Sequence, residues 1–184
     1  ALAQDAAPGA AGATAPQQAF SEMSIARIKA PDQLPEEEIA KAATQLTEKA
    51  IANLGGIERF VKRGDIVCLK PNIGFKSGPE AAANTSPDVV ATLVKLCLNA
   101  GAKKVKVCDN SCFGARDAYP WSGIEDAVKA AGGDIVYLDN VTPKEMDLQG
   151  ERLAVWPVFQ EIVESDLVIN VPVLKQHMLS KLSC

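Results

Sequence analysis

The sequence lacks the short patterns that most readily assign an activity. It contains no Walker-type phosphate loop, no G-x-G-x-x-G stretch and no Ser-His-Asp pattern. These absences exclude the simplest assignments to P-loop NTPases, dinucleotide-binding enzymes and triad hydrolases. Histidine is also scarce, because His177 is the only one in the chain. The function therefore has to be inferred from less specific features.

The chain also lacks an excess of positive charge. Its 19 Lys and Arg residues are outnumbered by 23 Asp and Glu residues, which gives a net charge of −4 and a pI near 5.1. A general nucleic-acid binder needs a basic face that displaces counterions from phosphates, so this class is disfavoured. Nothing in the sequence indicates a membrane span. The 184 residues, 47% hydrophobic and 23% charged, fit one globular domain.

The five cysteines are an odd number and do not describe a disulfide framework in a chain of this length. Cys68 lies in an apolar run and Cys97 on the apolar face of an expected helix, so both are predicted to be small core residues. Cys108 and Cys112 flank a polar turn and could pair, bind a metal or have no chemical role. Cys184 is the last residue and has no context.

Residues 1–20 consist mainly of Ala, Pro, Gly and Gln and show no apolar periodicity. Such a composition cannot repay its ordering entropy by burial, so this segment is predicted to be a flexible leader. The opening Ala1-Leu2-Ala3 fits the small-x-small pattern at a signal-peptidase cut, which predicts a periplasmic or otherwise exported protein. A cloning boundary is the alternative origin. Residues 21–184 are predicted to form a single α/β domain.

The first part of this domain is expected to begin with a short extended segment, Met23–Ile28, at a sheet edge. A helix is predicted from Pro35, with negative charge in its first turn, to the stop at Gly55-Gly56. A short helical piece is expected from Ile57 to Lys62. The apolar run that follows Asp65 predicts a strand covered on both faces.

Strands and helices then alternate. A helix is predicted from Ser86 to Asn99, followed by a strand at Lys103–Cys108, which a right-handed crossover makes parallel to the strand before it. The next pair is a helix at Trp121–Ala131 and a strand at Asp134–Leu138. This alternation predicts an α/β fold with a mostly parallel sheet and helices on both faces, in three layers.

The last part is predicted to contain a hairpin around Gln149-Gly150-Glu151, whose second strand is Arg152–Val158. A helical turn is expected within Phe159–Glu164. The run from Asp166 to Val171 is predicted to be a buried strand that ends at Pro172.

Polar residues follow each strand of the predicted sheet. In parallel sheets, ligands bind beyond the carboxyl ends of the strands, where loops and helix N-termini converge. Ordinary polar turns are the alternative reading of such residues. The strand ends carry Lys70 and Asn72, then Asp109 and Asn110, then Asp139 and Asn140, and finally Lys175 and His177.

Lys70 follows four apolar residues, and an isolated ammonium group is costly to bury. It is expected to face a ligand, solvent or a carboxylate, with Asp109 on the neighbouring strand as the alternative partner. Lys175 and His177 are two residues apart, so an extended backbone points both side chains the same way. They are the candidate catalytic residues, because they place a cation beside a histidine that can act as acid and base near neutral pH. A Lys70 and Asp109 pair could also serve proton transfer, which requires a lysine of depressed pKa next to an acid. Trp121 and Trp156 are expected to be packing residues.

Four segments form a recognisable series, namely residues 62–72, residues 85–90, residues 100–105 leading to Asp109, and residues 166–177. In this order and spacing they resemble the domain of unknown function 362, and the resemblance covers about residues 60–184. It implies an association with ferredoxin-type iron-sulfur modules and, in some members, export by the twin-arginine route. The family is also distantly similar to the catalytic region of nickel-dependent lactate racemases. That similarity makes Lys175 and His177 candidates for contact with a metal or cofactor.

The sequence departs from this family in two respects. It contains no ferredoxin cysteine run, and it stops at Leu182-Ser-Cys184, where family members continue. A C-terminal truncation that leaves the site incomplete is therefore expected.

Together these features predict a cleft at the strand ends that binds a small anionic ligand or a metal-containing cofactor, with a possible link to redox chemistry. Lys70, Asn72, Asp109 and Asn110 are the predicted ligand-binding residues, and the predicted metal ligands are His177, Cys108 and Cys112. The alternative is a non-catalytic exported accessory protein that binds an iron-sulfur or other redox partner.

Overall fold

The centre of the structure is a parallel sheet of four strands in the order β3-β2-β1-β6. The computed structural model describes residues 22–29 and 34–183. The strands are β1 (Ile66–Pro71), β2 (Lys104–Val107), β3 (Asp134–Ile135) and β6 (Leu167–Val171). The predicted α/β class with a mostly parallel sheet is confirmed.

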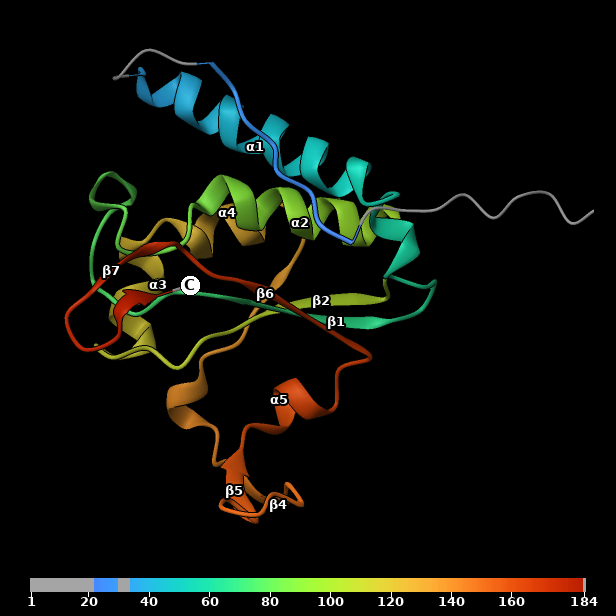
Figure 1. Ribbon diagram of the computed structural model, residues 1–184, viewed down its shortest axis with the longest axis vertical. Helices are drawn as coiled ribbons and strands as arrows, with labels where there is room; N and C mark the ends of the chain where they lie inside the picture. Colours follow the sequence, from blue (N-terminus) through green and yellow to red (C-terminus); the bar gives the residue numbers. More distant parts are fainter. Residues whose placement is uncertain (1–21, 30–33, 184) are drawn as a thin grey trace, which may run out of the picture.

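Three helices cover one face of this sheet in two tiers (Figure 1). Helices α2 (Pro87–Asn99) and α4 (Ile124–Ala130) contact the strands directly, and α1 (Glu36–Asn53) lies outside them against α2. Alternate residues of the strands point toward α2 and α4, which produces the larger apolar core. Its central residues are Val67, Leu69, Val90, Val94, Val105, Val107 and Val128.

The other face is covered more thinly, by α5 (Gln160–Val163), the turn η3 (Leu138–Asn140) and a hairpin of β4 (Lys144–Asp147) and β5 (Val155–Val158). Cys68, Cys108 and Leu138 form a small buried cluster there, against Phe159 and Ile162. Helices therefore lie on both faces, as predicted.

One buried ion pair joins this second face to α5. The Lys106 ammonium is almost inaccessible to solvent and donates to the backbone oxygen and to Oε2 of Glu161, at 2.8 and 2.9 Å. A buried ammonium needs such acceptors, because its desolvation is otherwise uncompensated.

Helix boundaries follow local signals. Proline occupies the first turn of α2 after Ser86, and α1 begins directly after Pro35 with three glutamates in its first turn. Gly55 and Gly56, at φ of 97° and 87°, end α1 in a conformation that other residues adopt only at a cost.

Several predictions for the first half of the chain need correction. Residues 23–29 form no strand, and only three residues of the predicted helical piece at Ile57–Lys62 are helical, in η1 (Ile57–Arg59). An unpredicted helix, α3, spans Ala115–Trp121. The helix predicted from Trp121 starts at Ile124 instead, because Gly123 at φ 73° separates α3 from α4.

The sheet strands near the end of the chain also differ from the prediction. Strand β3 stops after Ile135, since residues 138–140 turn into η3. The predicted hairpin and the helical turn predicted within Phe159–Glu164 are both present, as β4 with β5 and as α5. Strand β6 is not the buried strand that was predicted, because only Val171 in it is buried. Among the described residues β6 pairs with β1 alone, so it lies at the sheet edge.

The two tryptophans that were expected to be packing residues are half exposed, at 59% for Trp121 and 53% for Trp156. None of the helices in the described ranges is long and apolar enough to cross a membrane. The predicted leader at residues 1–20 and Cys184 lie outside the described residues.

Candidate functional site

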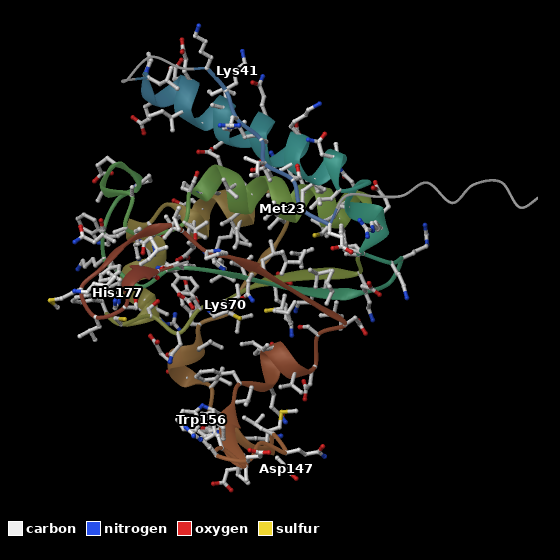
Figure 2. All side chains as sticks on the ribbon, in the orientation of Figure 1. Met23, Lys41, Lys70, Asp147, Trp156 and His177 are labelled. Carbon is white, nitrogen blue, oxygen red and sulfur yellow. The ribbon has the colours of Figure 1, made fainter. Side chains whose placement is uncertain are left out.

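A cleft of about 410 Å³ lies at the carboxyl ends of β1, β2 and β6. Most predicted site residues line it, namely Lys70, Asn72, Asp109, Asn110, Cys112, Lys175 and His177. Phe75, Asn170 and Pro172 are further lining residues. Lys175 and His177 come from β7 (Lys175–His177), which pairs with β8 (Lys181–Ser183) in a separate hairpin beside the sheet. Figure 2 shows His177 on this hairpin and Lys70 on the central strand.

Asp109 is the most firmly held residue of the cleft. Its Oδ1 lies 2.7 Å from the Lys70 ammonium, and its Oδ2 accepts the backbone N–H of Ile73 at 2.8 Å. The Tyr119 hydroxyl accepts the backbone N–H of Asp109 at 2.6 Å and donates to its backbone oxygen at 2.9 Å. Burial raises the pKa of Tyr119, so this hydroxyl stays protonated. The carboxylate partner that the sequence offered as an alternative for Lys70 is therefore present.

The end of β1 is joined to the end of β6 through one side chain. The Thr85 hydroxyl accepts the backbone N–H of Asn72 at 2.9 Å and donates to the backbone oxygen of Val171 at 2.7 Å. Asn84 binds the backbone of Phe75 in both directions, at 3.1 and 2.9 Å. These contacts hold the loop after β1 in place around the cleft.

Lys175 is a cation held by neutral groups. Its ammonium donates to Oδ1 of Asn72 at 2.9 Å and to the backbone oxygen of Ala83 at 2.5 Å, and it lies 4.7 Å from the centre of the Phe75 ring. Within the described ranges no carboxylate is within 4.0 Å of it, unlike the other cleft lysine, Lys70. Burial lowers the pKa of Lys175, while the Cys112 thiol and the Asp109 carboxylate act in the opposite direction.

His177 has its ring fixed by the turn that follows it. Its Nδ1 accepts the backbone N–H groups of Leu179 and Ser180, both at 3.2 Å. In the neutral ring the proton is then on Nε2, so Nε2 is a hydrogen-bond donor. A metal-bound histidine ordinarily donates its second N–H to an acceptor, and here the second nitrogen is itself the acceptor.

The three predicted metal ligands do not form one set, because only His177 and Cys112 line the cleft. Cys108 is buried on the thinly covered sheet face, where its Sγ lies 3.6 Å from Sγ of Cys68, whereas Cys112 is exposed at the cleft. In the part of the chain that the structure describes, no group of three His, Cys, Asp or Glu side chains is placed to hold a metal ion. The described residues therefore do not fit a metal centre.

Several residues of the site were not found from the sequence. Tyr119, Thr85 and Asn84 act by holding the cleft residues, and Phe75 supplies a ring beneath Lys175. Tyr119 lies on the unpredicted helix α3, and the other three lie in or next to a loop whose composition carries no pattern. Their partners are set by tertiary contacts, so no local signal reveals them. Asp139, in contrast, lies outside this cleft and accepts the backbone N–H of Ala115.

Two comparisons with known proteins found a match, one with a family and one with a single protein. The sequence model described as "Domain of unknown function (DUF362)" matches residues 67–184. A thylakoid-associated protein of Synechocystis sp. is 33% identical over 132 residues, which cover 67% of this chain and 38% of that protein. The chain thus spans well under half the length of this relative. No solved structure matches the chain. The predicted similarity to lactate racemases is not shown by these matches.

Proposed function

The chain belongs to the DUF362 family, and from that premise we propose that it binds a small organic anion in the cleft between Lys70 and Lys175. The charged lining residues are these two lysines and one carboxylate, Asp109. The cleft is thus locally positive in a chain whose net charge is −4. Its volume is within the usual range for sites that hold small molecules.

The observation that carries the proposal is the bonding of Lys175. Two neutral oxygens and an aromatic ring hold its ammonium at the cleft, and no carboxylate in the described residues lies within 4.0 Å of it. A cation that is partly desolvated and has no ion-pair partner gains most from an anionic ligand, because charge-assisted hydrogen bonds are the strong ones.

The other predicted residues have separate roles in this proposal. Lys70 adds positive charge but shares it with Asp109, and Asn72 orients Lys175. The Nε2–H of His177 and the amide of Asn110 are donors for the ligand's polar groups. Lys175 and His177 also remain the candidates for proton transfer, since burial lowers the pKa of Lys175.

An anion is a better ligand for this cleft than a metal-containing cofactor, because the predicted metal-binding side chains are not arranged around one point. The Nδ1 of His177 is already an acceptor, and the cysteines of the predicted metal set point to different regions. Export and an iron-sulfur or other redox partner stay predictions, and the relative's association with thylakoids is a property of that protein.

The proposal is tested by titrating the protein with acetate and with inorganic phosphate while following backbone amide signals by NMR. We expect shifts at Asn72, Gly74 and Asn110. Lys175→Gln keeps the hydrogen-bonding capacity but removes the charge, and is expected to weaken binding roughly tenfold or more.

The matched control is Lys41→Gln, an exposed lysine on α1 far from the cleft (Figure 2). It should bind both anions as the unaltered chain does. If both variants lost the same affinity for the anions, binding would depend on the net charge of the protein and not on Lys175. Absence of any shift around the cleft would favour the accessory-protein alternative.

A further inference from the structure

A second cavity, of about 300 Å³, also borders the Lys70 and Asp109 ion pair. It shares Lys70, Asp109 and Asn110 with the first cleft, so the two spaces meet at these residues. The rest of its lining is apolar and comes from η3, β5 and α5. These residues are Leu138, Trp156, Pro157, Val158, Phe159 and Ile162, together with Cys108.

The arrangement of the hairpin accounts for this space. Strands β4 and β5 stand away from the sheet, while Phe159 and Ile162 pack against the buried cluster of Cys68, Cys108 and Leu138 (Figure 1). Trp156 is left half exposed at the cavity, beneath Lys70 in Figure 2. An aromatic side chain of this size is seldom left beside an apolar hollow without a partner, because its burial is strongly favourable.

We propose that the two spaces take one molecule, an organic anion with an apolar ring system. Its charged group lies at Lys70 and Lys175, and its rings lie in the second cavity between Phe159 and Trp156. Lys70 connects the two parts, since its alkyl stem can lie along a ring while its ammonium faces the anion. This inference rests on the proposed anion-binding function and adds the class of the ligand.

Charge and polarity favour this occupant over a simple anion. The first cleft places two lysines and several hydrogen-bond donors beside Phe75 and the prolines, whereas the lining of the second cavity is mostly apolar side chains. An amphipathic molecule can use both, because the two spaces border the same residues, Lys70, Asp109 and Asn110. Aromatic rings beside a cation also gain from its charge.

The test compares 2-naphthoate with acetate, which share the carboxylate and differ in the rings. Removing roughly 100 Å² of apolar surface from water predicts that 2-naphthoate binds about 50- to 100-fold more tightly. Trp156→Ala should remove most of this advantage and leave acetate binding unchanged. Trp121→Ala removes an equally exposed tryptophan outside both cavities and is the matched control.

Each outcome distinguishes the two proposals. If acetate binds at the cleft and 2-naphthoate binds no more tightly, this inference is overturned while the proposed function stands. If 2-naphthoate binds but Lys175→Gln does not weaken it, the rings are held by the apolar cavity alone and the joint site is overturned. Equal losses in the two tryptophan variants would do the same. If acetate does not bind, the proposed function fails and this inference fails with it.

Discussion

The Asp109→Asn substitution offers the sharpest test of how the site is built. Asp109 is 8% exposed and its carboxylate holds both the Lys70 ammonium and the Ile73 backbone N–H. Asparagine has a similar shape, but its side chain offers one oxygen and one NH₂ group. One of the two donors would then face another donor, and Lys70 would lose its ion-pair partner.

The loss of stability expected in Asp109→Asn depends on how exposed Lys70 is. Breaking a fully buried ion pair costs about 3–5 kcal/mol, and a hydrogen bond to a charged group contributes about 1.5–3 kcal/mol. Because the Lys70 side chain is 41% exposed, its ammonium can regain water. We therefore expect the free energy of unfolding to fall by about 2 kcal/mol, which lowers the Tm by roughly 4–8 °C.

Urea denaturation followed by circular dichroism measures this change. The control is Asp117→Asn, which removes an ion pair between Lys76 and Asp117 at 3.3 Å. Both of those side chains are well exposed, so the expected loss is below about 1 kcal/mol. If the two variants lose the same stability, the reasoning that Asp109 holds the strand ends together is refuted.

Three further predictions follow from the same geometry. Tyr119→Phe leaves the buried backbone N–H of Asp109 without its acceptor and should reduce the free energy of unfolding by about 1–3 kcal/mol in urea; no loss would show that the hydroxyl is dispensable. Peptide mapping after brief alkylation of the native protein should find Cys112 labelled and Cys97 unlabelled, since Cys97 is buried and burial raises its pKa to about 11; equal labelling would contradict the burial. Burial lowers the pKa of Lys175 below the ordinary 10.5, so Lys175 should lose its charge, and the protein its affinity for acetate, at a lower pH than an ordinary lysine would. Lys175→Gln should abolish this pH dependence of acetate binding. An unchanged pH profile in the variant would assign the titration to another group.

The layout of the sheet could be predicted because its signals are local. The apolar run that forms β1 and the proline that opens α2 act within a few residues of themselves. Once strands and helices alternate, parallel pairing follows, and the carboxyl ends of β1 and β2 must lie together. For this reason the sequence alone predicts Asp109 as a possible partner of Lys70.

The remaining features depend on contacts that no local pattern encodes. Helix α3 contains Pro120 and has no side-chain cap, so its helical character is set by packing rather than by sequence signals. Cys108 was grouped with Cys112 by spacing, but the alternation of side chains along β2 turns Cys108 toward Cys68 on the adjacent strand β1. The exposure of β6 likewise depends on its place at the edge of the sheet.

The side-chain hydrogen bonds at the strand ends also determine how often the cleft opens. Three backbone amides beyond the ends of β1 and β2 donate to side-chain oxygens instead of to a neighbouring strand. Asn72 donates to Thr85, Ile73 to Asp109, and Asp109 to Tyr119. Their exchange with deuterium therefore requires tertiary contacts to break rather than a strand end to fray. The exchange rates of these three amides therefore measure the free energy of opening the cleft separately from the free energy of unfolding the sheet.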